Sequence, residues 1–166
     1  IGYAQESGLP YEIGLIKNRY VGRTFIQPTQ AQRERGVKMK LSAIQAIVKD
    51  RRIVMIDDSI VRGTTSRRIV RLLKDAGARE VHVRIASPAI QYPCFYGVDT
   101  SSREELISAR KNVDELCAYL HADSLKFLAI EDLYTAFQTT HLCCACFNGS
   151  YATPLYDYEQ ADKKER

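Results

Sequence analysis

Apolar and polar positions along this chain change period repeatedly, which predicts strands and helices in alternation. The run 53–56 is continuously apolar and mostly β-branched, as is typical of a strand buried on both faces. Apolar residues recur at helical spacing over 64–76 and stop at Gly77, and 80–86 again has a strand pattern. Strands that alternate with helices predict an α/β fold with a mainly parallel sheet flanked by helices.

The same patterns predict further elements on both sides of this unit. Residues 18–37 contain glycine, proline and several glutamines, so we expect a long loop there, and the charged tail from Gln160 is expected to fray. Ser101 and Asn112 are expected helix N-caps, because a glutamate follows each of them three residues later. The remaining predictions are short strands at 12–16 and 125–130, a helix end at 3–7, and helices at 41–49, 101–109, 113–120 and 131–137.

The turn that follows strand 53–56 carries the strongest chemical signal. Asp57 and Asp58 are adjacent and precede a stretch rich in glycine and hydroxyl side chains that ends at Ser66. Ligands of parallel sheets bind beyond the carboxyl ends of the strands, and a helix N-terminus there offers free N–H groups to a phosphate. Paired carboxylates supply hard oxygen ligands for Mg²⁺ or partners for ribose hydroxyls. A lone aspartate at this place is often only an N-cap, but two adjacent carboxylates repel unless a cation or donors lie between them.

Composition and charge narrow the partners of the chain. A length of 166 residues with 45% hydrophobic content suits one domain with a sizeable core. The net charge is +4, and the segment 17–40 concentrates it, with seven basic residues and one acidic residue. This segment indicates a polyanionic partner, and sparse aromatic residues favour a small phosphate over nucleic acid. No apolar run approaches the roughly 18 residues of a membrane span, so no membrane is expected.

Five cysteines form a second candidate site: Cys94, Cys117, Cys143, Cys144 and Cys146. The Cys-x-x-Cys spacing of 143–146 indicates a metal or redox site more than a disulfide in a cytosolic chain. Zinc with His141 is one alternative, and a thioredoxin-like site is weaker because its βαβ context is missing. Cys117 lies on the predicted helix 113–120 and is expected to be a small core residue, whereas Cys144 remains a competing ligand.

Several of these stretches resemble one known family. The segment from Val54 to Ser66 resembles the phosphoribosyl pyrophosphate (PRPP) motif of type I phosphoribosyltransferases. Residues 14–28, 38–42 and 87–100 narrow the resemblance to glutamine phosphoribosylpyrophosphate amidotransferases, in the iron-sulfur-containing branch, over about residues 1–156. The resemblance implies a type I phosphoribosyltransferase fold that is truncated at its N-terminus, without the first strand and the glutaminase domain. Residues 1–137 would form the incomplete transferase domain, and residues 138–166 a segment with the Cys-x-x-Cys pair and a charged tail.

The resemblance also implies an activity. Ammonia, made from glutamine in the missing domain, displaces pyrophosphate from PRPP and gives 5-phosphoribosylamine, the first step of de novo purine biosynthesis. The full-length protein would be a cytoplasmic glycosyltransferase and a homo-oligomer, with purine nucleotides as feedback inhibitors and no nucleic-acid partner. The fragment by itself is expected to be inactive.

The family's functional residues carry over to named positions. The resemblance implies that Asp57 and Asp58 hold the ribose hydroxyls and Mg²⁺. Arg23 and Lys40 are candidates for pyrophosphate contacts from a lid, and no residue is an obvious general base. Cys94, Cys143 and Cys146 would ligate a [4Fe-4S] cluster whose fourth ligand lies outside this chain. The residues expected to bind the substrate are Asp57, Asp58, Ser59, Arg62, Gly63, Thr64 and Thr65.

Two alternatives use the same fold. One is a PRPP-binding regulatory protein, and the other is a different type I phosphoribosyltransferase acting on a purine base or orotate. A repressor or attenuator needs a nucleic-acid-binding module, which no motif of this sequence indicates. The set Cys94, Cys143 and Cys146 also has no evident purpose in a simple PRPP sensor, and other type I phosphoribosyltransferases usually lack the cysteine tail and the run 18–25.

Overall fold

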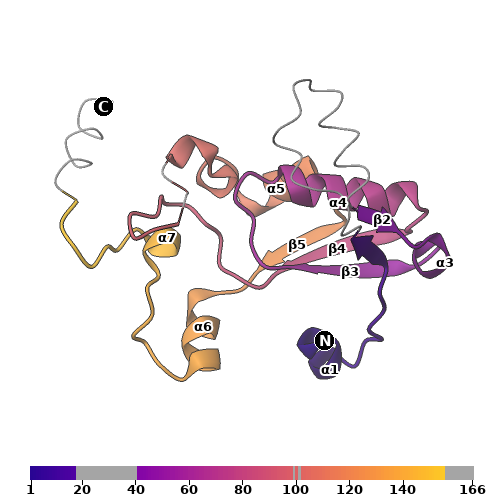
Figure 1. Cartoon of the computed structure of the whole chain (residues 1–166), viewed down its shortest axis with the longest axis horizontal. Coiled ribbons are helices and arrows are strands. Elements are labelled where there is room, and N and C mark those ends of the chain that lie inside the picture. Colours follow the sequence, from indigo (N-terminus) through magenta and orange to yellow (C-terminus); the bar gives the residue numbers. More distant parts are fainter. Residues whose placement is uncertain (18–40, 99, 101, 156–166) are drawn as a thin grey trace.

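A three-stranded parallel sheet is the centre of the fold. The computed structural model describes residues 1–17, 41–98, 100 and 102–155. Strands β3 (Arg52–Asp57), β4 (Glu80–Ile85) and β5 (Ser124–Phe127) lie in the order β3-β4-β5, with both pairs parallel. Helices α4 (Thr64–Asp75) and α5 (Val113–Leu120) lie along the same face of this sheet (Figure 1). The predicted α/β fold with a parallel sheet is therefore confirmed.

Burial alternates along β4 and places the core between the sheet and the two helices. The prediction that 53–56 is buried on both faces is wrong, since Met55 is buried but Ile56 is 48% exposed. On β4, Val81, Val83 and Ile85 are buried, whereas Glu80, His82 and Arg84 between them are half-buried on the other face. Helices α4 and α5 cover the core with apolar side chains at helical spacing, as the sequence predicts. The fully buried side chains include Val70 and Leu73 from α4, Leu116 and Leu120 from α5, and Val48.

The first strands form a separate antiparallel pair. Strand β1 (Leu15–Lys17) pairs with β2 (Leu41–Ala43), and residues 18–40, which include Arg23, Lys40 and the predicted loop, lie outside the described residues. The helix predicted over 41–49 is wrong in its first half, since only α3 (Gln45–Val48) is helical. The backbone of 41–43 pairs with β1 instead, and such tertiary pairing overrides a weak helical pattern.

Other boundaries differ by smaller amounts. The strand predicted at 125–130 ends at Phe127, because the Leu128 N–H donates to the carbonyls of Ile85 and Ser87 and Ile130 begins a helix. The helix predicted at 101–109 consists of two 3₁₀ turns, η2 (Arg103–Glu105) and η3 (Ile107–Ala109), and Ser101 lies outside the described residues. The remaining helices are α1 (Gly2–Ser7), α6 (Ile130–Phe137) and α7 (Ala145–Asn148).

The Asn112 cap is confirmed in full. Its Oδ1 accepts the Glu115 N–H at 2.9 Å, and Glu115 Oε2 accepts the Asn112 N–H at 2.9 Å, which is the reciprocal capping box that the spacing predicts. No helix among residues 1–17, 41–98 and 102–155 has the length and apolar character needed to cross a membrane.

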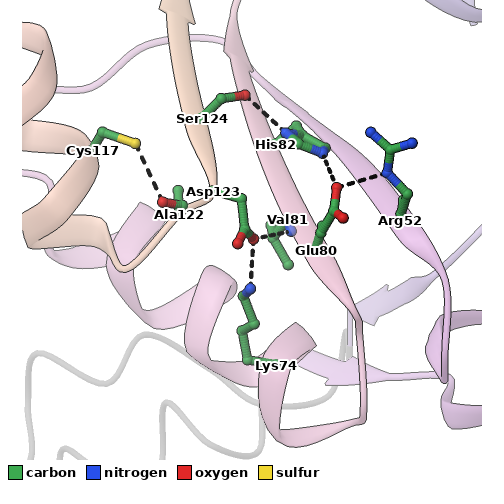
Figure 2. A network of polar contacts seen from close by, with 9 residues as sticks. All are labelled: Arg52, Lys74, Glu80, Val81, His82, Cys117, Ala122, Asp123 and Ser124. Carbon is green, nitrogen blue, oxygen red and sulfur yellow. Dashed lines mark hydrogen bonds and ion pairs between the residues drawn. The ribbon is translucent and has the colours of Figure 1, made fainter.

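Polar side chains tie the strands together at the end of the sheet opposite Asp57. Figure 2 shows Asp123 accepting hydrogen bonds from Lys74 Nζ at 2.5 Å and from the Val81 N–H at 2.6 Å. Glu80 accepts from Arg52 and contacts His82, whose other ring nitrogen contacts Ser124. These contacts link β3, β4 and β5 to α4 and fix the strand starts, so the strand ends are presented in register at the opposite edge.

Candidate functional site

Asp57 and Asp58 lie where β3 ends, at the carboxyl edge of the sheet. Asp57 is half-buried and Asp58 is exposed. The Asp58 N–H donates to Asp57 Oδ1 at 3.1 Å, and Ser59 Oγ donates to Asp58 Oδ1 at 2.9 Å. The structure therefore places both carboxylates on one short turn, the first fixed by the backbone and the second open to solvent.

The electrostatics of Asp57 favour a cation beside it. Burial raises the pKa of Asp57, the Asp58 N–H lowers it, the Asp58 charge raises it again, and a weak hydrogen bond from Ser66 Oγ lowers it. The net direction is upward, since burial dominates. A divalent cation would reverse this balance, because an opposite charge within a few ångströms stabilises the ionised carboxylate.

Helix α4 begins directly after this turn with free donors. Its N-cap is Gly63, with φ of 73°, and no side chain of the described residues caps this helix end. The first helical hydrogen bond runs from the Arg67 N–H to the Gly63 carbonyl at 2.9 Å, so the amides of Thr64, Thr65 and Ser66 have no helical partner. Thr64 and Thr65 are exposed. This helix end presents N–H groups, hydroxyls and the positive end of the helix dipole to an anion.

A distant segment supports the turn from beneath. The Ile107 N–H donates to the Val61 carbonyl at 2.9 Å, and Arg62 Nη2 donates to Glu105 Oε2 at 2.6 Å. A Cβ at Gly63 would lie 3.0 Å from Ile107 Cδ1 and 3.2 Å from Tyr119 Cε1. The glycine is therefore required by packing inside the protein as well as by its φ. Sequence reasoning did not single out Glu105 or Ile107, and no local pattern marks them.

Among the described residues, one cavity borders the turn and a larger one lies beside β3. A cleft of about 510 Å³ is lined by Arg62, Thr64 and side chains of 105–119. A larger cavity of about 730 Å³ lies between residues 1–15 and the chain from Ala46 to Ile56, and its lining does not include Asp57. The carboxylates and the helix N-terminus, which are the groups suited to a phosphate and a cation, lie at the turn and do not line the larger cavity.

The segments that carry Cys94 and Cys146 lie side by side, although they are far apart in sequence. The amides of Gln91 and Tyr92 both donate to the Cys146 carbonyl at 3.0 Å, and the Tyr151 hydroxyl donates to the Pro93 carbonyl at 2.8 Å. Burial raises the pKa of the Cys146 thiol, and the neighbouring thiols of Cys94, Cys143 and Cys144 raise it further. Together these four residues, named here the cysteine cluster, occupy one neighbourhood.

The side chains of the cysteine cluster are not arranged as a metal site among the described residues. Within the parts of the chain that the structure describes, no three cysteine, histidine or acidic side chains are arranged to hold a metal ion. Cys144 is buried and its thiol raises the pKa of the Tyr134 hydroxyl, whereas Cys143 is exposed. Cys117 packs against the core and its Sγ donates to the Ala122 carbonyl at 3.3 Å, which confirms its expected structural place.

Comparisons with known proteins agree on one kind of relative. No family model matches the chain. The amidophosphoribosyltransferase of Bacillus subtilis is 57% identical over 162 residues, which is 94% of this chain and 34% of that protein. The enzyme of the same name from Synechocystis is 53% identical over 165 residues, covering 98% of this chain and 33% of that protein.

Solved structures give the same picture. The B. subtilis glutamine PRPP amidotransferase complexed with ADP and GMP matches 93% of this chain and 35% of its own, with a TM-score of 0.83 and 57% identity. A structure described as the allosteric regulatory enzyme of purine biosynthesis matches 94% of this chain and 35% of its own, with a TM-score of 0.84 and 58% identity. The chain spans about a third of the length of these relatives. With its type I phosphoribosyltransferase fold, it is a homologue of the phosphoribosyltransferase part of the amidophosphoribosyltransferases.

Proposed function

We propose that this chain supplies the PRPP-binding part of an amidophosphoribosyltransferase. The observation that carries the proposal is the uncapped N-terminus of α4, which directly follows the paired carboxylates of Asp57 and Asp58. In the proposed reaction ammonia attacks C1 of PRPP, the new C–N bond forms, and the C1–O bond breaks. Pyrophosphate leaves with the electron pair, and the ammonium product loses a proton to solvent.

The turn would bind the 5′-phosphate end of the substrate. The amides of Gly63, Thr64 and Thr65 and the two threonine hydroxyls can donate to the phosphate oxygens, and Ser59 and the Arg62 backbone border them. The Arg62 guanidinium is engaged with Glu105, so its contribution would come from the main chain. Binding the phosphate at this fixed point places C1 of the ribose near the carboxylates, which is the positional contribution of the protein.

Asp57 and Asp58 would hold the ribose hydroxyls and Mg²⁺. Protein sites for Mg²⁺ often use only one or two carboxylates, with water and substrate phosphates completing the shell, so this pair fits the ion. Bound Mg²⁺ supplies charge stabilisation for the departing pyrophosphate. Arg23 and Lys40 are proposed to reach the pyrophosphate from the segment outside the described residues. No general base is needed on this chain, because the nucleophile is neutral ammonia.

We also propose that Cys94, Cys143 and Cys146 ligate a [4Fe-4S] cluster, with a fourth thiolate from outside this chain. Their shared neighbourhood and the effect of Cys94 and Cys143 on the Cys146 thiol support the set. With only three of four ligands on this chain, an open arrangement is the expected one. The division into a transferase domain (1–137) and a cysteine-containing segment (138–166), a cytoplasmic homo-oligomer and purine nucleotide feedback complete the proposal.

A chimera tests this function. This chain would replace the matching third of the B. subtilis relative, and phosphoribosylamine formation from PRPP and ammonia would be measured. Turnover that depends on Mg²⁺ supports the proposal. A folded chimera that binds PRPP without turnover would favour the regulatory protein, and one that binds no PRPP would overturn the PRPP site. Turnover with a purine base or orotate in place of ammonia would favour the other type I phosphoribosyltransferases.

A further inference from the structure

The phosphate-binding turn has little backbone support of its own. Between Asp58 and Gly63, two backbone-to-backbone hydrogen bonds are found among the described residues. One is the Arg67 N–H donating to the Gly63 carbonyl within α4, and the other is the Ile107 N–H donating to the Val61 carbonyl. The second comes from another part of the chain, so it anchors the turn to the rest of the protein.

The side chain of Ile107 strengthens this anchor. Ile107 is only 4% exposed, and its Cδ1 and Cγ2 approach the position of a Gly63 Cβ at 3.0 and 3.6 Å. Leu106 before it is fully buried, so the main chain of this segment is fixed in the core. Tyr119 from α5 closes the same side of Gly63 at 3.2 Å. The turn therefore packs against buried side chains on one side, while Thr64 and Thr65 on its other side remain exposed.

Glu105 fixes the neighbouring arginine. Its Oε2 accepts from Arg62 Nη2 at 2.6 Å, and both side chains are about half exposed. An exposed pair of this kind contributes little free energy. Its effect is geometric, because it draws the long side chain of Arg62 towards η2.

We propose that Ile107 is a positioning residue for PRPP: it holds the phosphate-binding turn in its donor-presenting shape from beneath, and Glu105 assists it by fixing Arg62. This inference rests on the proposed function of the turn. Several backbone N–H groups bind one anion only when they all point towards it. If the backbone of the turn shifts, these N–H groups no longer point towards the same position. Binding of the phosphate end should weaken, while the chemistry at C1 should change less.

The test compares two truncations in the chimera. Ile107→Ala removes the side chain that packs beneath Gly63. Leu73→Ala is the matched control, because Leu73 is similarly buried, at 2% exposed, but lies at the far end of α4 from the turn. Ile107→Ala should raise KM for PRPP about tenfold with less than a twofold change in kcat. The reason is that the lost phosphate contacts stabilise the bound substrate and the transition state equally. Leu73→Ala should lower the Tm by a similar amount without changing KM. Ile107→Val should restore most of the affinity, and Glu105→Gln should change KM less than twofold.

A second measurement does not depend on turnover. Amide hydrogen exchange at Arg67, whose N–H makes the first helical hydrogen bond of α4, should be faster in Ile107→Ala than in the unaltered 166-residue chain. It should be unchanged in Leu73→Ala. Equal KM values and equal exchange in the two variants would overturn the inference while leaving the proposed function intact. If the unaltered chimera fails to bind PRPP, the proposed function fails, and the exchange result still decides whether Ile107 holds the turn.

Discussion

The turn from Asp57 to Ser66, where we propose that the phosphate binds, and the cysteine cluster are built in opposite ways. The turn uses consecutive residues from Asp57 to Ser66, and its side chains meet through contacts between near neighbours. The cysteine cluster joins the loop after β4 to the segment around α7, and it depends on backbone contacts such as those from Gln91 and Tyr92 to Cys146. A local site is formed as soon as its strand and helix form, whereas the cluster requires the whole of 94–146 to be in place.

The largest expected effect concerns the local site. Asp57→Asn combined with Asp58→Asn should weaken Mg²⁺-dependent PRPP binding by about a hundredfold or more, because both hard oxygen ligands lose their charge. Isothermal titration of the chimera measures the affinity, and circular dichroism checks the fold. Asp75→Asn, an exposed residue at the end of α4, is the matched control. Unchanged PRPP affinity in the double variant would remove both carboxylates from the site.

The cysteine cluster should respond to a single thiol. Cys146→Ser in the chimera, purified without oxygen, should abolish the brown absorption and the bound iron, because a cluster needs each thiolate. Cys117→Ser serves as the control, since Cys117 packs in the core and its pKa is raised by burial. PRPP affinity should change less in Cys146→Ser than in the double aspartate variant. A colourless unaltered chimera that contains one zinc would contradict the assignment of the cluster.

A change at the opposite edge of the sheet should affect stability and neither site. Although partial burial opposes ionisation, the hydrogen bonds from Lys74 and the Val81 N–H lower the pKa of Asp123. A lowered folded pKa stabilises the fold above the unfolded pKa, and this stabilisation is lost as pH falls through the folded value. Asp123→Ala should therefore cost about 1 kcal/mol at pH 7, mainly through the unpaired Val81 N–H, with a smaller cost at acidic pH. Urea unfolding at several pH values measures this, and a cost independent of pH would contradict the ionic part.

The smallest expected effect has the opposite sign. Burial raises the pKa of Asp57 above 3.8 in the folded protein, so ionising this carboxyl destabilises the fold. The free energy of unfolding therefore falls as pH rises from the unfolded pKa through the folded pKa of Asp57. Asp57→Asn alone should raise the Tm of the chain at pH 7 by a few degrees at most, and the gain should vanish below about pH 4. Differential scanning calorimetry at both pH values tests this. A lower Tm of Asp57→Asn than of the unaltered chain at pH 7 would show that the ionised Asp57 carboxylate does not destabilise the fold.

The sequence predicts the strand and helix on either side of the turn, but not the contacts that support the turn. The strand-to-helix turn at Asp57–Thr64 was predicted because its residues and its flanking periodicities are contiguous. The Asn112 cap was predicted for the same reason. The part played by Ile107 and Glu105 is set by how α5 and the 3₁₀ turns pack on the turn, and no spacing in the sequence encodes that contact.

Non-local pairing explains the main error, and it also determines where the cysteine segments lie. Residues 41–43 carry a helical pattern, yet they pair with β1 because the backbone of Leu15–Lys17 lies beside them. Cys94 was joined with Cys143 and Cys146 by resemblance rather than by spacing, and the structure brings their segments together through Tyr92 and Tyr151. Long-range contacts of this kind are visible only once the fold is known.

The contact between 91–92 and Cys146 closes a long loop that contains α5, β5 and α6. The entropy of such a closure grows only slowly with length, by about 0.6 kcal/mol for each doubling. Insertions between α6 and α7 should therefore be tolerated readily in natural variants. The closing point itself has no such freedom: at Gly149, with φ of 75°, any Cβ would lie 2.9 Å from the ring of Tyr92. Insertions are thus tolerated between α6 and α7, whereas a side chain at Gly149 is not.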